Sequence, residues 1–457
     1  MSTSAPPLET LAEWASRVAF GDIPADQHQR TRLQLLDTLG LIAAAANHPA
    51  GRSLRAWTDG NAGAGATVLT SGKAVAPAVA ALVHGSLAHA RDFDDTFPDT
   101  VVHPGSTVIA AALAAGERAD APFAQLIAAI VVGYEIAARL GAVAGRGFHA
   151  HGFHATSVVG PIAAAAAAAR ILALDAAQTA DALGLATSMS GGLLAFLADG
   201  GWSKWLHTGW AAHGGMVAAE IAAHGFRGPR RALDHHYGLY AAFLGGTETD
   251  LGILTENLGH NWLGLAAQPK YFPCAHVIQP YIAAVLALRE RGLLRGKTMQ
   301  SLRCIVAPWA LPIVGEPRAI KVAPHNDLEA IASLPYMVAA ALCDGRVDLA
   351  TLAPETIGRA DIRALAERIA CEADDRLGSG FDGRIELTAA DGQRISHPVA
   401  LPAFSEQRLI EKFRANTAHL PPDACAALEG ALLEDEPSTR TLVQRAAAVM
   451  SGRETQP

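Results

Sequence analysis

The sequence APAVAALVHGSLAHA, residues 76–90, runs directly into RDFDDTFPDTVVHPGS, residues 91–106. The first stretch is apolar at most positions and predicts a buried helix. The second stretch is rich in charge, because between His89 and His103 the chain carries four carboxylates and an arginine. A helix that emerges from a hydrophobic core usually ends at the surface with one or two polar capping residues. This density of charge therefore indicates either an acidic capping loop or a functional site.

Residue spacing predicts the local structure around these polar groups. If the helix continues to Thr96, then His89, Asp92 and Thr96 share one of its faces. A new helix is expected to begin at residues 106–107, where Ser and Thr are favourable N-caps. The positive end of that helix lies next to His103 in the sequence and would attract an anion.

Composition narrows the class of protein. Of the 457 residues, 50% are hydrophobic and 18% are charged, which is typical of a helix-rich globular protein with a large core. The formal net charge of -8 and the lack of a long Lys/Arg run argue against nucleic-acid binding. An acidic protein that binds an anionic substrate must gather positive groups in one pocket.

Cysteine usage and the N-terminus predict a cytoplasmic protein. The five cysteines are odd in number and include no C-x-x-C pair, as expected for reduced thiols in the cytosol. The N-terminus lacks the basic and apolar segments of a signal peptide. Apolar runs such as residues 126–132 and 161–169 are too short to cross a membrane, so no membrane association is expected.

Helical periodicity dominates the chain up to residue 265. Residues 66–69 could form a short strand, but no convincing sheet is expected in this part. The glycine-rich residues 60–65 lack the G-x-G-x-x-G pattern after a strand, which excludes a dinucleotide site there.

Strand patterns appear after residue 267. Residues 302–307 read as a strand, and residues 384–397 as a hairpin with Asp391-Gly392 in a type I′ turn. The sequence returns to helix near its end. We therefore predict a mainly α fold in which a smaller α+β lid domain is inserted before the C-terminal helices. The predicted boundaries are residues 1–267 and 401–457 for the large all-helical domain and 268–400 for the lid domain.

Four further segments place histidines, lysines or a tyrosine beside predicted helices in apolar surroundings. They are residues 147–157, 199–210, 270–276 and 333–336. Each has an ordinary structural explanation. Lys204 between two tryptophans can extend along the surface, and His149, His151 and His154 lack a carboxylate at a metal-ligand spacing. Together, however, the segments indicate a buried pocket for a small polyanion, and they leave proton transfer next to a carboxylate as the chemistry.

The chain resembles the MmgE/PrpD family in six motifs that follow one another over nearly its whole length. These are H-A-R-D-F-D-D-T, H-P-G-S, G-F-H-A-T-S, W-S-K-W-L-H-T-G-W-A-A, K-Y-F-P-C-A-H and S-L-P-Y-M-V-A-A-A-L. The family holds 2-methylcitrate dehydratase, cis-aconitate decarboxylase and iminodisuccinate epimerase. The resemblance implies a pocket between a helical domain and a lid domain, a homodimer, and no metal or organic cofactor.

The resemblance also implies the site residues. The catalytic residues would be Asp92, His103 and His154, and the substrate contacts would be Thr96, Lys204, Lys270, His276 and Tyr336. Arg91 stands where the family usually has a small or apolar residue, and it could add a carboxylate contact.

We expect a lyase that transfers a proton next to a carboxylate of a small di- or tricarboxylate. The first expectation is a hydro-lyase similar to 2-methylcitrate dehydratase. The alternatives are an enzyme similar to cis-aconitate decarboxylase or to iminodisuccinate epimerase and, more remotely, a non-catalytic polycarboxylate-binding protein. His103 is the expected general acid–base, oriented by Asp92 and complemented by His154. The two lysines, Lys204 and Lys270, are expected to clamp carboxylates.

Overall fold

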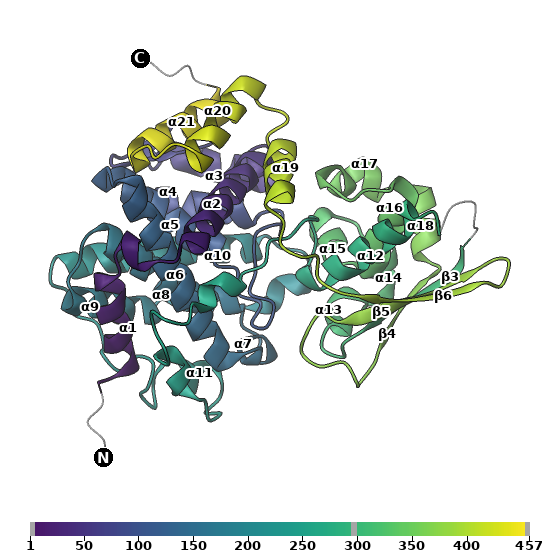
Figure 1. Ribbon diagram of the computed structural model, residues 1–457, viewed down its shortest axis with the longest axis horizontal. Coiled ribbons are helices and arrows are strands. Elements are labelled where there is room, and N and C mark those ends of the chain that lie inside the picture. Colours follow the sequence, from purple (N-terminus) through teal and green to yellow (C-terminus); the bar gives the residue numbers. More distant parts are fainter. Residues whose placement is uncertain (1–4, 294–298, 453–457) are drawn as a thin grey trace. The chain divides into compact units, whose positions relative to one another are not determined.

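The computed structural model describes residues 5–293 and 299–452 of the chain (Figure 1). Helices account for 58% and strands for 9%, which confirms the mainly α class. The chain forms two compact units. The helical unit comprises residues 1–90, 94–269 and 406–457, and the α+β unit comprises residues 91–93 and 270–405.

The helical unit is a bundle built around the alanine-rich α8, which packs against α5, α6, α9 and α10. Seven consecutive alanines of α8, residues 163–169, are fully buried, because their small side chains let neighbouring helices approach closely. The helices of the unit are α1 (Pro7–Arg17), α2 (Ala25–Ala45), α3 (Pro49–Asp59), α4 (Pro77–His89), α5 (Gly105–Ala119), α6 (Phe123–Ala144), α7 (Gly147–Ala150), α8 (Ala155–Ile171), α9 (Ala176–Thr187), α10 (Ser203–Ala223), α11 (Leu239–Phe243), α19 (Glu406–Asn416), α20 (Pro422–Leu433) and α21 (Thr439–Ser451).

The helix α8 continues through a proline in its second turn. Pro161 has no N–H, so the carbonyl of Ser157 loses its helical partner. The N–H of Gly191 donates to that carbonyl instead, at 3.3 Å. This long-range bond gives the carbonyl of Ser157 a partner, and α8 begins at Ala155, directly after His154.

The helix α6 is the longest apolar helix of the described chain, with 22 residues. By length and hydropathy it could cross a membrane, but 89% of its apolar window is buried inside the structure. It is thus covered by neighbouring helices, as in the core of a soluble protein.

A small antiparallel sheet corrects the expectation that the first part of the chain has no sheet. β1 (Ala66–Val68) pairs with β2 (Lys73–Val75). The sequence signal was weak because each strand has only three residues.

The α+β unit contains a four-stranded sheet of order β4-β3-β5-β6 (Figure 1). The strand β3 runs parallel to β4 and antiparallel to β5. The strands are β3 (Met299–Val306), β4 (Ile369–Ala373), β5 (Gly383–Ala389) and β6 (Arg394–Val399). The helices are α12 (Gln279–Glu290), α13 (Leu311–Val314), α14 (Arg318–Val322), α15 (Asp327–Ile331), α16 (Leu334–Asp344), α17 (Pro354–Ile357) and α18 (Ala360–Ala366).

The predicted hairpin is present as β5 and β6, but its type I′ turn was wrong. A type I′ turn needs a positive φ at both central residues, whereas only Gly392, at φ 84°, has one in this loop. The N–H of Ala389 bonds to the carbonyl of Gln393. The loop is therefore one residue longer than predicted, and Gly392 takes its left-handed position.

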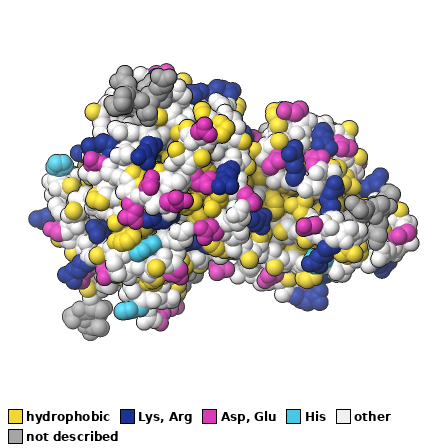
Figure 2. All heavy atoms as spheres, turned by 45° about the horizontal axis from the view of Figure 1, so that its top comes forward, with side chains coloured by type: hydrophobic (Ala, Val, Ile, Leu, Met, Phe, Trp, Pro, Cys, Tyr) yellow, Lys and Arg dark blue, Asp and Glu magenta, His cyan; other side chains and the backbone are white. Residues whose placement is uncertain are grey.

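The surface carries charges of both signs. On the face shown in Figure 2, acidic and basic side chains lie intermixed, with hydrophobic side chains between them.

Candidate active site

The first part of the site is the chain that follows α4. This helix ends at His89, and Asp92 has a left-handed φ of 46°. The predicted helical face shared by His89, Asp92 and Thr96 is therefore wrong. A residue with a left-handed φ cannot continue a right-handed helix, and the short side chain of Asp tolerates this backbone conformation.

The N-terminus of α5 is capped by a residue that is distant in sequence. Asp95 accepts a hydrogen bond from the N–H of Gly105 at 3.0 Å and another from the hydroxyl of Tyr134 at 2.7 Å. The helix begins at Gly105, so the predicted start at residues 106–107 was wrong. The positive helix end therefore meets the Asp95 carboxylate.

Three buried histidine rings lie together in the helical unit. His89 and His103 have ring centroids 4.6 Å apart, and His154 lies 5.8 Å from His89 and 6.2 Å from His103. None of the three residues is more than 6% exposed. Two of them were predicted site residues, and the structure brings them together although 51 residues separate them in the sequence (154 minus 103).

The carboxylate of Asp94 joins two of these rings. Both of its oxygens lie 2.9 Å from Nδ1 of His89, and one lies 3.2 Å from Nδ1 of His103. Burial by itself would raise the pKa of Asp94, but the charges of His89 and His103 outweigh it and hold that pKa well below its usual value. Asp94 is therefore ionised and lies in contact with both rings.

The surroundings of His103 decide which of its nitrogens carries a proton. Nδ1 lies 3.1 Å from the carbonyl oxygen of Asp95 and 3.1 Å from the hydroxyl of Thr96. A carbonyl oxygen only accepts, so Nδ1 carries the proton and Nε2 is the basic nitrogen. Thr96 is thus a direct neighbour of His103, and it also forms a backbone bridge with Gln268.

His154 precedes α8 and is kept neutral by its surroundings. Its Nδ1 lies 3.3 Å from Nδ1 of His207. Burial first, and then the charges of His89 and Lys204, lower the pKa of His154 well below its usual value. Burial also lowers the pKa of His149 to about 3. His103 beside Asp94 and neutral His154 therefore form an asymmetric pair.

The predicted clamp Lys204 lies in the first turn of α10. This helix begins at Ser203. Lys204 is half-buried, and its positive charge contributes to the lowered pKa values of His149, His154 and His207. It is the lysine whose charge acts on the histidine cluster.

The remaining predicted residues lie in the α+β unit. Lys270 Nζ lies 2.6 Å from the carboxylate of Asp92 and 2.7 Å from its carbonyl oxygen, and both side chains are buried. Arg91 pairs with Asp327 at 3.1 Å. Beyond these pairs, the Tyr336 hydroxyl donates to the carbonyl of Thr351 at 2.6 Å, and the His276 ring lies 5.1 Å from that of Phe381.

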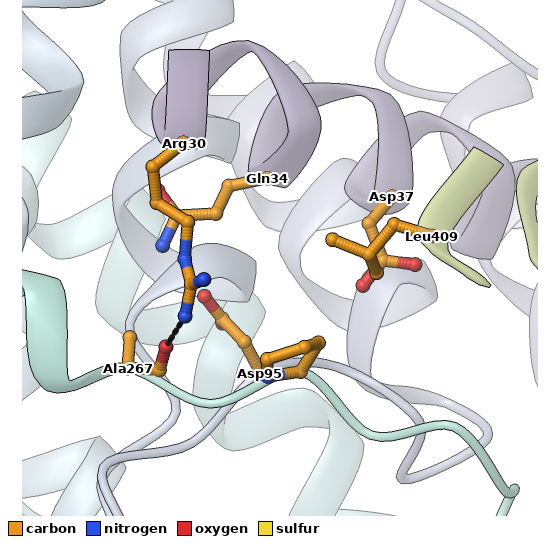
Figure 3. A pocket seen from close by; sticks show the side chains of 7 residues that line it. Arg30, Gln34, Asp37, Asp95, Ala267 and Leu409 are labelled. Carbon is orange, nitrogen blue, oxygen red and sulfur yellow. Dashed lines mark hydrogen bonds between the residues drawn. The ribbon is translucent and has the colours of Figure 1, made fainter. Parts of the chain in front are cut away.

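A small pocket of the helical unit borders Asp95 (Figure 3). The centre of a water molecule can occupy about 10 Å³ of this pocket. This volume is enough for about one water molecule. Burial raises the pKa of Asp95 to about 7. The pocket is too small for a polycarboxylate. Its lining residues are Arg30, Gln34, Asp37, Asp95, Ala267, Pro269 and Leu409.

Sequence reasoning missed His89, Asp94 and His207 as members of the site. Its candidate for the carboxylate of His103 was Asp92, and the structure shows Asp94 in direct contact with that ring. The available signal was the D-x-D pattern itself, which offers two carboxylates but does not say which one faces the histidines.

The sequence comparisons assign the chain to a family. The model for the MmgE/PrpD N-terminal domain matches residues 9–252, and the model for the MmgE/PrpD C-terminal domain matches residues 272–433. The chain belongs to the MmgE/PrpD family.

Curated relatives narrow the class further. The cis-aconitate decarboxylase-like protein oryM of Aspergillus oryzae is 26% identical over 88% of this chain and 89% of its own. A cis-aconitate decarboxylase of Aspergillus terreus is 24% identical over 88% of each chain, and that of Homo sapiens is 30% identical over 75% of this chain and 73% of its own. The relatives support an enzyme of the lyase class.

Proposed function

We propose that the protein is a lyase that removes CO₂ from cis-aconitate or a closely similar unsaturated tricarboxylate. The observation that carries the proposal is the contact of His103 with the buried, ionised Asp94, opposite the neutral ring of His154. The names of the relatives favour decarboxylation over the dehydration that we expected first.

The chemistry needs one proton at a defined carbon. When the C–C bond to a carboxylate breaks, CO₂ leaves, and the electron pair of that bond forms a new C=C bond to the neighbouring carbon. The π electrons of the original double bond move to its far carbon. The resulting carbanion must receive a proton from an acid of the protein. His103 is suited to this step because the anion of Asp94 favours its charged form. His154 is neutral and can accept a hydrogen bond from the substrate.

Binding an anionic substrate requires positive charge in a site poor in water. Lys204 supplies it near the histidines, acting as a point charge on a carboxylate. Lys270, His276, Tyr336 and Arg91 stay predicted substrate contacts, and Asp92 stays a predicted catalytic residue.

The test is to incubate the purified protein with cis-aconitate and a panel of polycarboxylates in deuterated water and follow proton NMR. We expect release of CO₂ and a product with deuterium at the protonated carbon. A hydrated product would instead identify a dehydratase, and exchange at carbon without net turnover would identify an epimerase. Binding without any exchange would leave a non-catalytic binding protein.

A further inference from the structure

The three buried histidines have the geometry of a ligand set for a metal ion. One nitrogen from each of His89, His103 and His154 lies within 4.8 Å of the other two. Three imidazoles on a tetrahedral zinc at ~2.1 Å would hold their ring centres roughly 5.2 Å apart, so the observed centroid distances need shifts of about 1 Å or less. Those distances are 4.6, 5.8 and 6.2 Å.

The ring of His89 carries a second, independent sign of a ligand. It is fully buried, and its Nε2 has no hydrogen-bond partner among the described residues. Its Nδ1 faces both carboxylate oxygens of Asp94 at 2.9 Å. In proteins, a metal-binding histidine is commonly oriented by a carboxylate that bonds to one ring nitrogen and leaves the other ring nitrogen available for the metal. A buried nitrogen without a partner otherwise costs stability.

The other two rings are oriented in the same way. Nδ1 of His103 lies 3.2 Å from Asp94, and Nδ1 of His154 lies 3.3 Å from Nδ1 of His207, which makes Nε2 the natural ligand atom in both.

The charges near the cluster act in both directions. The carboxylate of Asp94 lies against the rings of His89 and His103 and would offset part of the charge of a divalent ion. Lys204 is positive and opposes such an ion, since its charge reaches His154. Because these two charges oppose each other, we expect only ions with a high affinity for imidazole, such as transition-metal ions, to bind here. Mg²⁺ and Ca²⁺ prefer oxygen ligands and should not bind.

We propose that His89, His103 and His154 bind a divalent transition-metal ion such as Zn²⁺, and that the bound ion reversibly inhibits the enzyme. The ion would occupy the nitrogen atoms that exchange protons with the substrate, so it acts as an inhibitor and not as a cofactor. Metal binding is independent of the proposed function, and only the inhibition rests on it.

The binding test is a Co²⁺ titration of chelator-treated protein, followed by visible absorption. We use a His235→Gln/His236→Gln background, because these adjacent surface histidines could bind metal weakly. We expect intense absorption that saturates at a single ion per chain and is displaced by Zn²⁺. His89→Gln and His154→Gln should each weaken binding by at least about 100-fold, the upper end of what loss of even an outer partner costs a metal site. His151→Gln, an exposed histidine outside the cluster, is the matched control and should bind as the parent does.

Circular dichroism checks that each variant is folded. If His89→Gln fails to fold, thermal unfolding of the parent and of His154→Gln tests the site instead. Zn²⁺ should raise the Tm of the parent but not that of His154→Gln. Absence of the Co²⁺ absorption, or unchanged affinity in both variants, would overturn the site.

The inhibition test adds Zn²⁺ and then a chelator to the active enzyme. Turnover should fall with the same concentration dependence as binding, return on chelation, and survive dialysis against the chelator alone. Stoichiometric binding with undiminished turnover overturns the inhibitory role and leaves the metal site standing. Lack of turnover in every sample bears on the proposed function and not on the site.

Discussion

At the scale of single residues, the two site histidines have different surroundings. His103 contacts an ionised carboxylate, whereas His154 is held neutral by burial and by nearby positive charge. The two rings thus face neighbours of different charge, which suits them to different roles. This asymmetry leads to two predictions.

The first prediction is that His103→Ala lowers kcat by about 10²–10⁴-fold, the usual contribution of a general acid–base. Lys204→Ala should instead raise KM, because it removes a point charge that holds a substrate carboxylate. Steady-state kinetics on folded variants, with His151→Ala as an exposed control, separates the two effects. A His103→Ala enzyme with near-normal kcat and only a raised KM would pass the role to His154.

The second prediction concerns Asp94 as a positioning residue. Asp94→Asn removes the anion that faces Nδ1 of His103, so the limb of the pH–rate profile that reports this histidine should move to lower pH. Asp99→Asn, an exposed carboxylate of the same segment, should leave the profile in place. An unmoved profile in Asp94→Asn would mean that Asp94 has only a structural role.

At the scale of elements, close contact between α4 and α10 supports the site, because these helices carry His89 and Lys204. Gly209 lies where a Cβ would come within 2.2 Å of the carbonyl oxygen of Leu82 and 2.1 Å of Ser86 Oγ. Because glycine has only a hydrogen in place of a side chain, α4 and α10 can approach each other closely at this position.

The third prediction follows from that contact. Gly209→Ala should destabilise the protein by about 1–3 kcal/mol, because the backbone of α4 must move and this outweighs the gain in helix propensity. Gly214→Ala is the matched control in the same helix, since its new Cβ would meet only ordinary contacts from 3.4 Å. It should be neutral or stabilising by up to about 1 kcal/mol. Urea unfolding of both variants checks this, and equal stabilities would contradict the close packing.

Another buried histidine of α4 makes stability depend on pH. His84 is 1% exposed, and its Nε2 accepts a hydrogen bond from the N–H of Leu69 at 3.1 Å. Burial lowers its pKa from 6.5 to about 4. Between these values the unfolded chain binds a proton that the folded chain does not. Its contribution to stability is therefore present above pH 6.5 and is lost as the pH falls towards 4.

The fourth prediction is that His84→Gln reduces the pH dependence of unfolding in this window by up to about 1.4 kcal/mol per pH unit. Glutamine can keep the hydrogen bond from Leu69 but does not titrate. Free energies of unfolding from urea titrations across the window measure the slope, and exposed His151→Gln should not change it. A slope in His84→Gln equal to that of the wild type would show that His84 does not titrate there.

At the scale of the whole molecule, the structure indicates which surface is available for a homodimer. The alanines at residues 163–169 of α8 are buried inside the helical unit, so they offer no surface to a second copy. An apolar stripe instead lies at the start of α10, where Trp202, Leu206 and Trp210 are 43%, 45% and 51% exposed. Their spacing of four residues places them on one face of the helix.

The fifth prediction is that two copies of the chain associate through this stripe, because burying three large apolar side chains favours association. Light scattering should give about twice the mass of 47.4 kDa at micromolar concentration. Leu206→Glu combined with Trp210→Glu should give a monomer, whereas Tyr237→Glu, at a residue 82% exposed, should not. A monomeric wild type would refute the dimer, and a dimeric double variant would move the interface elsewhere.

The sequence by itself determined the mainly α class, the position of most helices and the family, because these follow from local periodicity and from motifs that lie in order along the chain. It also identified His103, His154 and Thr96, which the structure places together. Only the tertiary structure decided that Asp94 pairs with His103 and His89, that Asp95 caps α5, and that α4 ends at His89. These contacts join residues only five to ten positions apart, but they cross the non-helical loop between α4 and α5. How that loop folds depends on its packing in the protein, so residue spacing alone does not show which carboxylate meets which group.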